Sequence, residues 1–427
     1  MHSHALNEVD MNVNIVVSEF KKAFGSEPEV VVSAPGRLDF LNTHQDYKNL
    51  PVVSVGINLR TYIAGRRADE KSIEVCSGNL LDEGGEHFDK IELTSLEILP
   101  KQKWFGNYLR AALIALLQKG YKVGGAKAWI RSWVPIASGL GSSGTLLVAF
   151  IGFLNELFNL GLTIKDVAEL AYVAEHDVLG IPCGRLDQYA AAFGNISIIE
   201  TVPPYNVESI SFNEGVFAVI DSGIRHSTAD IHPKRQKEIE IGLEKLMSIA
   251  PADLRKLLGY RYWEPKWSSL TIEQLQPYLH ELDDKIRNRI LYTIKAHNST
   301  ILAVKVLRGY KPTYTEVAKA LEIDYESAKK LVEKGKIDII GHIMTYQHNL
   351  LSSLYDVSLP EIDKIVEEFI NNGASGAKLS GAGLGGCVIA LFKDVETAHK
   401  ALSTMLSKGV GTRGWVVKVD RGVIRHR

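Results

Sequence analysis

The most constraining feature of this sequence is a short glycine-rich stretch that runs directly into a long apolar segment. Residues 139–144 read GLGSSG, and almost every side chain of residues 145–158 is apolar. The second segment predicts a helix that is apolar on all sides, and such a helix must be buried inside a domain. Because residues 126–134 resemble a strand, the glycine loop is predicted to lie between a strand and the N-terminus of this helix.

A glycine loop at a helix N-terminus is a candidate anion site. The first backbone N–H groups of a helix have no intrahelical partner, and the helix dipole favours negative charge there. Ser142 and Ser143 could offer hydroxyls to a phosphate or to its magnesium ion. A P-loop NTPase is excluded, because Thr145 and not lysine follows Gly144.

Two other interpretations of the loop are weaker. A Rossmann dinucleotide site would need the loop in the first strand-to-helix turn and an acidic residue about 20 positions later. Here residues 160–163 read LGLT at that distance. The structural alternative is a tight turn that only packs a helix onto a sheet.

Chain length favours two domains, because 427 residues exceed the size at which one hydrophobic core keeps growing. The turn-rich stretch 202–213 contains Pro203-Pro204 and predicts the boundary. The expected domains are residues 12–208 and 209–427. Strand-like and helix-like segments occur in both parts, which predicts a mixed fold of the α+β class.

Charge and hydropathy exclude several classes of partner. The 49 Lys and Arg residues nearly balance 50 Asp and Glu residues, so no global basic field exists for nucleic acid or an anionic membrane. The longest apolar runs, 111–117 and 146–154, are shorter than the roughly 18 residues of a membrane span. The N-terminus shows no secretory signal, so we expect a cytoplasmic protein with free thiols at Cys76, Cys183 and Cys387.

Polar residues interrupt apolar sequence directly after the first predicted strand, which is expected to end at Ala34-Pro35-Gly36. Residues 37–47 read RLDFLNTHQDY, and such a loop could bind the hydroxyls of a sugar. The alternative is a solvated loop in which Asp39 or Asp46 caps a turn.

Two further carboxylates lie in apolar surroundings. Asp187 introduces the small, apolar segment 188–194, and a partly buried carboxylate needs a partner, for which Arg37 is the candidate. A helix N-cap is the alternative role for Asp187. Glu175 borders the apolar stripe of a helix that is predicted to begin at Thr163 with a near-match to the capping box.

Together these segments resemble the GHMP small-molecule kinases, and specifically their galactokinase branch. Residues 33–39 (SAPGRLD) with 44–47 (HQDY) are similar to the galactokinase signature, usually APGRVNLIGEHTDYN. Residues 135–144 (PIASGLGSSG) resemble the phosphate loop, and residues 376–387 (GAKLSGAGLGGC) resemble the third motif, GARxTGxGxGGC. The resemblance implies a two-domain GHMP kinase fold. Its N-terminal domain would be like ribosomal protein S5 domain 2, its C-terminal domain ferredoxin-like, and its active site between them.

The same resemblance implies a galactokinase-like enzyme that uses ATP and Mg²⁺ to phosphorylate the anomeric hydroxyl of a small sugar. Asp187 would accept the proton of that hydroxyl, and Arg37 would orient Asp187 and neutralise the transferred phosphoryl group. Ser143 and Glu175 would bind Mg²⁺. The residues implied to bind ATP are Trp104, Ser138, Gly139, Leu140, Gly141, Ser142, Ser143, Gly144 and Thr145. Those implied to bind the sugar are Arg37, Thr43, His44, Asp46, Gly184, Asp187 and His232.

Departures from the motifs bear on the substrate. Asn42 and Thr43 replace the glycine and glutamate of GEH, which removes a carboxylate expected at a sugar hydroxyl. In the segment that follows residues 226–227, His232 stands where a galactokinase tyrosine faces the sugar, and Gly144 replaces the usual alanine. A galactose-like pyranose fits best, and a uronic acid or an amino sugar is the alternative.

Two other functions follow from the same motifs. A non-catalytic sugar sensor could bind ATP and sugar, but the retained Arg37 and Asp187 favour an enzyme. A dinucleotide oxidoreductase would leave Glu175 and Asp187 without a role. The sequence makes no prediction of the oligomeric state.

Overall fold

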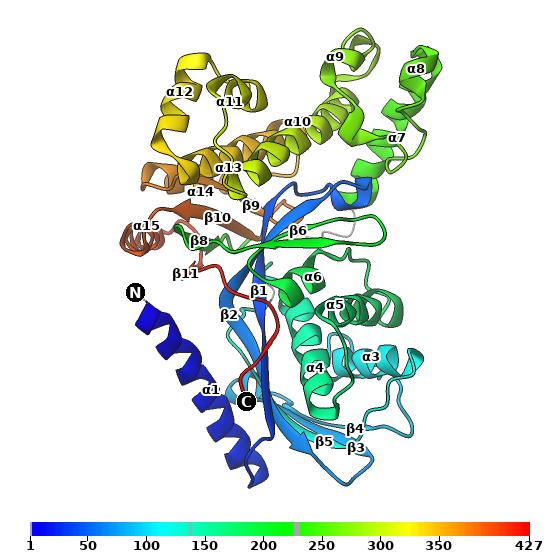
Figure 1. Cartoon of the computed structure of the whole chain (residues 1–427), viewed down its shortest axis with the longest axis vertical. Coiled ribbons are helices and arrows are strands. Elements are labelled where there is room, and N and C mark those ends of the chain that lie inside the picture. Colours follow the sequence, from blue (N-terminus) through cyan, green and yellow to red (C-terminus); the bar gives the residue numbers. More distant parts are fainter. Residues whose placement is uncertain (1, 137, 226–230) are drawn as a thin grey trace. The chain divides into compact units, whose positions relative to one another are not determined.

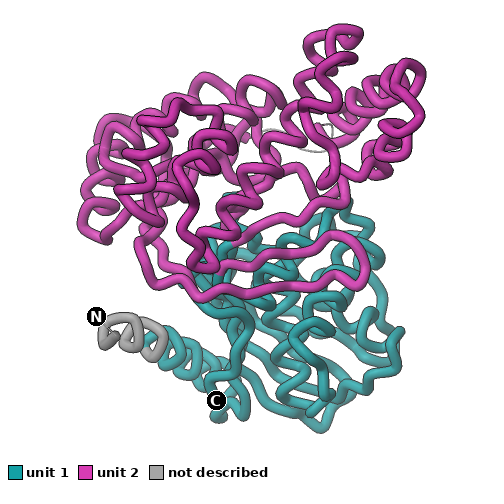
Figure 2. Tube along the Cα trace, turned by 45° about the horizontal axis from the view of Figure 1, so that its top comes forward, with its two compact units in different colours: residues 1–37, 55–195, 420–427 teal, residues 38–54, 196–419 magenta. Residues whose placement is uncertain are grey.

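A computed structural model describes every residue of the chain except 1, 137 and 226–230. The side chains of residues 2–10 are also not described. The chain forms two compact units that interleave along the sequence. Unit 1 contains residues 1–37, 55–195 and 420–427, and unit 2 contains residues 38–54 and 196–419 (Figure 2).

Unit 1 is a sheet with helices on both faces (Figure 1). Its strands are β1 (Val30–Leu41, entering unit 2 at Leu38), β2 (Val52–Arg67), β3 (Ser72–Ser77), β4 (Phe88–Glu92), β5 (Ala126–Ser132) and β12 (Ile424–Arg425). Its helices are α1 (His2–Phe24), α2 (Gly78–Asp82), α3 (Phe105–Gln118), α4 (Ser142–Phe158), α5 (Ile164–Val173) and α6 (Leu186–Phe193), with a π-helical turn η2 (Ala174–Val178). The strand order is β12-β1-β2-β5-β3-β4.

The apolar helix predicted after the glycine loop is α4, and it lies buried against one face of this sheet. Gly65 on β2 leaves room for it, because a Cβ there would stand 2.5 Å from the ring of Phe153. On the other face, α1 packs Val16 and Phe20 against Val31 and Tyr62. The glycine loop is therefore held at the end of a helix that has little freedom to move.

Unit 2 contains a four-stranded antiparallel sheet and many helices. Its strands are β6 (Ile196–Ile199) and β7 (Val207–Ile210), which pair with each other, and the four strands of the sheet, β8 (Val216–Asp221), β9 (Gly376–Ser380), β10 (Cys387–Phe392) and β11 (Arg413–Val417). Its helices are α7 (Ile231–Ile249), α8 (Ala252–Arg255), α9 (Ile272–Leu275), α10 (Asp284–Leu307), α11 (Tyr314–Leu321), α12 (Tyr325–Lys334), α13 (Lys336–Ser353), α14 (Pro360–Asn371) and α15 (Val395–Ser407), with short turns η1 (Asp46–Lys48), η3 (Trp267–Ser269) and η4 (Leu279–Glu281).

The four strands are ordered β11-β8-β10-β9, and each neighbouring pair is antiparallel. Helices α13, α14 and α15 pack along this sheet (Figure 1). Phe369 of α14 and Met405 of α15 join Ala390 of β10 in one buried core. The mixture of sheet and helix in both units confirms the predicted α+β class. No helix in the described part of the chain is long and apolar enough to cross a membrane.

The first strand differs from the sequence prediction. We expected β1 to end at Ala34-Pro35-Gly36, but it continues to Leu41. Among the described residues, the neighbouring strand β12 pairs with β1 only at Val32 and Ser33, so the missing N–H of Pro35 breaks no ladder with β12. As a result, Arg37 and Asp39 lie on a strand and not in a loop.

The compact units also differ from the predicted single boundary. Residues 38–54 join unit 2, the last eight residues join unit 1, and the chain changes unit between 195 and 196. A boundary based on turn residues does not reveal this, because β12 returns to pair with β1 across the whole length of the sequence. As a division of the sequence into family domains, 12–208 and 209–427 stays a prediction.

Arg60 fixes the returning C-terminal segment. Its guanidinium is buried and donates to Asp420 Oδ2 (2.8 Å), to the carbonyl of Gly422 (2.6 Å) and to Ser33 Oγ (2.7 Å). Replacing it by methionine should destabilise the protein by about 3–5 kcal/mol, because several buried acceptors lose their donor.

The midpoint of urea unfolding measures this loss. Arg66→Met is the matched control on the same strand, because Arg66 is 40% exposed and its nearest carboxylate, Glu29, is 3.8 Å away; its expected cost is below about 1 kcal/mol. Equal midpoints for the two variants would contradict the assigned role of Arg60.

Candidate active site

The glycine loop of unit 1 ends at a helix N-terminus that no side chain of the described residues caps. Gly141 occupies the N-cap position of α4 with φ of 76°, and Gly139 has φ of 75°. Both values are in the left-handed region, which glycine adopts without strain. The first N–H groups of α4 therefore remain available to an anion, as the sequence predicts.

The other residues of the loop hold its shape. Ser138 donates to the carbonyl of Pro135 (2.7 Å), and buried Thr145 donates to the carbonyls of Gly141 (2.7 Å) and Pro35 (3.0 Å). Ser142 and Ser143 are half-buried at the start of α4. The hydroxyls of Ser138 and Thr145 are thus engaged by backbone carbonyl groups, whereas Ser142 and Ser143 lie at the N-terminus of α4, where an anion would bind.

Arg37 joins the glycine loop to Asp187. Its Nε and Nη2 both lie 2.7 Å from Asp187 Oδ1, and its Nη1 donates to the carbonyl of Gly139. The predicted Arg37–Asp187 ion pair is therefore present. Because both nitrogen atoms meet Oδ1, the described residues leave Oδ2 of Asp187 for another donor.

The N-cap alternative for Asp187 is wrong. Helix α6 begins at Leu186, and its N-cap position is Arg185. Gly144 brings Asp187 close to α4, since a Cβ at Gly144 would stand 2.9 Å from the Cβ of Asp187. Gly184 lies in the exposed loop three residues before Asp187.

Glu175 lies next to this group on the π-helical turn η2, directly after α5. Single π turns inside helices frequently mark functional sites. Glu175 is 5% exposed, and its carboxylate accepts hydrogen bonds from Ser143 and from Gln188 Nε2 (2.6 Å). Burial raises the pKa of Glu175, the hydroxyl of Ser143 acts against that shift, and the charge of Asp187 adds to it.

This arrangement fits a hard cation. Ser143 and Glu175 offer adjacent oxygen atoms, which are the donors Mg²⁺ prefers. Oε1 of Gln188 is buried without a hydrogen-bond partner among the described residues, so it could accept from a metal-bound water. The described residues contain no cluster of three or more His, Cys, Asp or Glu side chains that could hold a metal by themselves. Mg²⁺ that keeps several waters and binds a phosphate needs only one or two carboxylates.

Trp104, which the sequence predicts beside the adenine, occupies the N-cap position of α3. Its indole N–H donates to Asp89 Oδ2 (3.0 Å), and Asp89 is itself paired with buried Arg110. The ring is half-buried, with Lys101 Nζ 4.8 Å from its centre. Its position is therefore fixed, and contact with adenine stays a prediction.

In unit 2, the polar residues after Arg37 surround a buried histidine. His44 is 4% exposed and has φ of 63°. Its Nε2 lies 2.9 Å from the carbonyl of Ala382, in the second glycine loop between β9 and β10. A carbonyl only accepts, so Nε2 carries the proton. Burial lowers the pKa of His44 well below its usual value.

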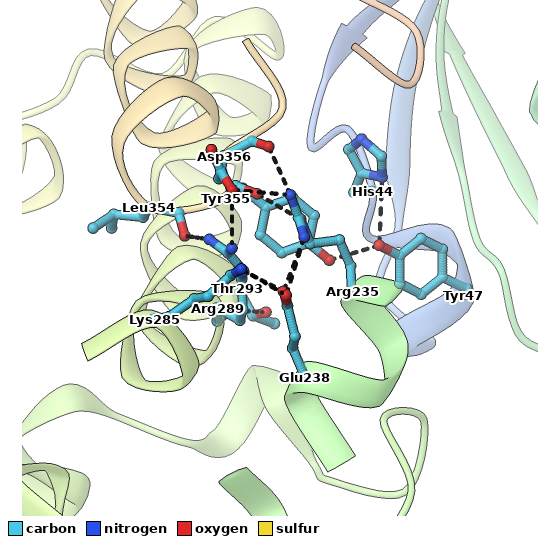
Figure 3. Close-up of polar contacts among 10 residues, drawn as sticks. All are labelled: His44, Tyr47, Arg235, Glu238, Lys285, Arg289, Thr293, Leu354, Tyr355 and Asp356. Carbon is cyan, nitrogen blue, oxygen red and sulfur yellow. Dashed lines mark hydrogen bonds and ion pairs between the residues drawn. The ribbon is translucent and has the colours of Figure 1, made fainter. Parts of the chain in front are cut away.

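The other nitrogen of His44 faces a pair of tyrosines (Figure 3). Nδ1 lies 3.4 Å from the hydroxyl of Tyr47, and that hydroxyl lies 2.6 Å from the hydroxyl of Tyr355. Two buried arginines fix the backbone at Tyr355. Arg235 Nε donates to the carbonyl of Tyr355 (2.7 Å), and Arg289 Nη1 donates to the carbonyl of the preceding residue, Leu354 (2.5 Å). The histidine is thus held in one orientation by residues distant in the sequence.

The two arginines share Glu238 as a counter-ion. Glu238 Oε2 accepts from Arg289 Nε (2.7 Å) and Arg235 Nη1 (3.0 Å), and Lys285 lies 3.4 Å from Oε1 (Figure 3). These contacts lower the pKa of Glu238 although burial acts in the opposite direction. The network supports residues 42–48, the histidine loop, and no feature of the sequence indicated it.

His232 lies beside His44, and the charge of Asp46 acts on His232. The His232 ring lies 5.0 Å from that of His44 and 5.3 Å from that of Tyr47. Burial lowers the pKa of His232, and the carboxylates of Asp46 and Asp39 act against that shift. Burial raises the pKa of Asp46, and His232 acts against that shift. Residues 226–227, which belong to the same motif segment, lie outside the described residues.

Thr43 is buried beside two residues that the sequence prediction left out. Its hydroxyl contacts Asp39 and Lys378, and its carbonyl accepts from Tyr292 Oη (2.6 Å). Asp39 belongs to the first motif and Lys378 to the third. Their placement in two motifs was a signal that could have found them, whereas their mutual contact depends on the fold.

Comparisons with known proteins give the family. A model of the GHMP kinases N terminal domain matches residues 107–195, a model of the GHMP kinases C terminal region matches 328–411, and a galactokinase galactose-binding signature matches 18–67. A galactokinase of Thermococcus kodakarensis is 30% identical over 366 residues, which cover 85% of this chain and 89% of that protein. The chain belongs to the GHMP kinases.

Further relatives agree. A galactokinase of Pyrococcus furiosus is 28% identical over 410 residues, covering 92% of this chain and 99% of the relative. The crystal structure of a Lactococcus lactis galactokinase complexed with galactose matches with a TM-score of 0.74 at 22% identity, over 96% of this chain and 99% of that one. A mevalonate kinase of Methanococcus jannaschii matches with a TM-score of 0.62 at 18% identity, over 92% of this chain and 98% of the other, which shows the shared fold.

Membership in the GHMP kinases makes the protein a kinase of the galactokinase type. The N-terminal family match contains the glycine loop, Glu175 and Asp187, and the C-terminal match contains Lys378. The two-domain GHMP kinase fold expected from the sequence is confirmed. The residues predicted to bind ATP and Mg²⁺ all belong to unit 1. Of those predicted to bind the sugar, Arg37, Gly184 and Asp187 belong to unit 1, and Thr43, His44, Asp46 and His232 belong to unit 2.

Proposed function

We propose that this kinase transfers the γ-phosphoryl group of ATP to the anomeric hydroxyl of galactose or a galactose-like sugar. The observation that carries the proposal is the Arg37–Asp187 ion pair, which lies against a glycine loop at an uncapped helix N-terminus. Phosphoryl transfer depends mainly on in-line positioning and charge stabilisation, and these groups supply both. The relatives named galactokinase support the choice of sugar.

The reaction can be written with these residues in defined roles. The oxygen of the sugar hydroxyl forms a bond to the γ-phosphorus, and the bond between that phosphorus and the β–γ bridging oxygen breaks, giving sugar 1-phosphate and ADP. Asp187 Oδ2 accepts the hydroxyl proton, while Arg37 holds Oδ1 in place. The N–H groups at the start of α4 bind the phosphate oxygens.

Ser143 and Glu175 would hold Mg²⁺, which when bound neutralises charge on the phosphates. Their own contribution is to place two oxygen ligands at the first turn of α4. Because burial raises the pKa of Glu175, a nearby cation would favour its ionised form.

Glu175→Gln should raise the Mg²⁺ concentration needed for half-maximal turnover by about tenfold or more, because a neutral amide is a weaker ligand than a carboxylate. Sugar binding in the absence of ATP should not change. Titration of initial rates with MgCl₂ at fixed ATP measures the effect.

Glu169→Gln is the matched control. Glu169 is a half-buried carboxylate on α5 that is paired with Arg185 (2.8 Å) and Tyr189 (2.7 Å). Its magnesium dependence should match that of the wild type. An unchanged magnesium dependence in Glu175→Gln, with the protein folded, would remove Glu175 from the metal site.

A modified sugar is the second candidate substrate. His232 lies beside His44 and Tyr47, where its imidazole could contact a substituent that galactose lacks, such as a carboxylate or an amino group. ADP release measured with galactose, galacturonate, galactosamine and N-acetylgalactosamine distinguishes the candidates. Binding of sugar and ATP without ADP release for any of these sugars would contradict the kinase proposal and support a sugar sensor.

A further inference from the structure

A buried chain of hydrogen bonds in unit 2 links Lys378 on β9 to Asp39 on β1 through the hydroxyl of Thr43. Lys378 Nζ lies 3.0 Å from Thr43 Oγ1, and Thr43 Oγ1 lies 3.0 Å from Asp39 Oδ1. The three residues are at most 4% exposed. Burying an ammonium and a carboxylate costs desolvation free energy unless both groups are hydrogen-bonded. The hydrogen bonds of this chain offset part of that cost.

The direction of each hydrogen bond is determined by the chemistry of the donors. Lys378 Nζ has three acceptors: Thr43 Oγ1, the carbonyl of Asp39 (3.1 Å) and the carbonyl of Leu379 (2.7 Å). They take all three hydrogens of an ammonium group. Thr43 Oγ1 accepts from Lys378, and the single hydrogen of its hydroxyl therefore points to Asp39 Oδ1.

The hydrogen bonds among Lys378, Thr43 and Asp39 leave one oxygen atom, Asp39 Oδ2, for a ligand. Thr43 has no hydrogen left to donate to a sugar, and Lys378 has none either. No described residue donates a hydrogen bond to Asp39 Oδ2. Asp39 is also close to the residues expected to bind the sugar, because its charge acts on both Asp46 and His232.

The positive groups nearby are already engaged. Lys48 Nζ donates to Thr293 Oγ1 (3.0 Å) and lies 4.5 Å from the centre of the Tyr355 ring, fully buried. Burial lowers the pKa of Lys378 to about 8, and its ammonium group has no unused hydrogen. This part of unit 2 therefore presents the carboxyl groups of Asp39 and Asp46 and the imidazoles of His44 and His232.

We infer that Asp39 is the specificity-determining carboxylate of this kinase, and that Lys378 and Thr43 are positioning residues that aim its Oδ2 at a hydrogen-donating substituent of the sugar. The inference rests on the proposed function and narrows its substrate class. The carboxylate that the family motif has at position 43 is replaced by one at position 39, four residues earlier on the same segment. The carboxylate of Asp39 repels an anionic substituent, so the substrate is a sugar with hydroxyl or N–H donors and not a uronic acid.

Asp39→Asn tests the inference directly. The amide keeps the size of the side chain and an oxygen for Thr43, but it removes the charge. The KM for galactose should rise about ten- to hundredfold, because a charged hydrogen-bond acceptor is lost. The kcat and the KM for ATP should change little, and the ratio of kcat/KM for galacturonate to that for galactose should increase.

Thr43 variants test the positioning role without touching the carboxylate. Thr43→Val removes the hydroxyl and should also raise the KM for the sugar, whereas Thr43→Ser keeps the hydroxyl and should recover most of that loss. Asp363→Asn is the matched control, because Asp363 accepts hydrogen bonds from His348, Ser352 and Ser358 elsewhere in unit 2. Its sugar preference should be that of the wild type.

The outcomes separate the inference from the proposed function. No ADP release by the wild type with any sugar of the panel overturns both. An active wild type with an unchanged KM and sugar preference in folded Asp39→Asn overturns the inference alone. If thermal melts show that Asp39→Asn does not fold, equal KM values for Thr43→Val and Thr43→Ser overturn it.

Discussion

Asp187→Asn is expected to lower kcat by about a hundredfold or more, which is the range of general acid–base catalysis. The amide has nearly the same shape and can still accept from Arg37 through its oxygen, so the fold and the sugar KM should be preserved. What is lost is the negative charge and the ability of Oδ2 to take a proton. Initial rates of ADP release at saturating sugar and ATP measure the effect.

Asp177→Asn is the control for this variant. Asp177 lies in the same unit, its side chain is 58% exposed, and it pairs only with His176 at 2.7 Å among the described residues. It should have the turnover of the wild type. If folded Asp187→Asn also kept near-normal turnover, the ion pair with Arg37 would be structural, and the base would have to be another group.

The sequence predicted best what depends on neighbouring residues. The apolar run 145–158 could only be a buried helix, and Thr163 with Asp166 could be identified as a helix start; the structure has α4 and a complete capping box there. The glycine loop was also predictable from neighbouring residues, because its glycines stand directly before the apolar run. The structure agrees, since Gly139 and Gly141 have positive φ values that favour glycine.

A contact between residues far apart in the sequence was predictable only where a partly buried charge needed a partner of opposite charge. A partly buried Asp187 needed a cation, and Arg37 was the cation in a neighbouring motif. By contrast, the continuation of β1 through Pro35 depends on how short β12 is. Thr43 stands where the family motif has glutamate, which indicated the loss of a carboxylate. Only the fold shows that Asp39 Oδ1 lies 3.0 Å from the hydroxyl of Thr43.

Arg37→Lys is expected to have the second large effect, a loss of about a hundred- to thousandfold in kcat, comparable to the removal of a preorganised donor at a developing charge. Arg37 holds Asp187 Oδ1 with two nitrogen atoms and the carbonyl of Gly139 with a third. A lysine ammonium is a compact point charge and cannot reproduce this fork. The glycine loop and the carboxylate would therefore lose their common support, and both kcat and the KM for ATP should worsen.

The matched control for Arg37→Lys is Arg131→Lys, because Arg131 also binds carboxylates with its fork, at Glu19 and Asp82 in unit 1. Both variants lose a comparable ion pair, so their unfolding midpoints should fall by similar amounts. Only Arg37→Lys should lose turnover, since only its guanidinium connects the phosphate loop with Asp187. Equal turnover in the two variants, with both folded, would mean that the fork of Arg37 stabilises the fold of unit 1 and takes no part in phosphoryl transfer.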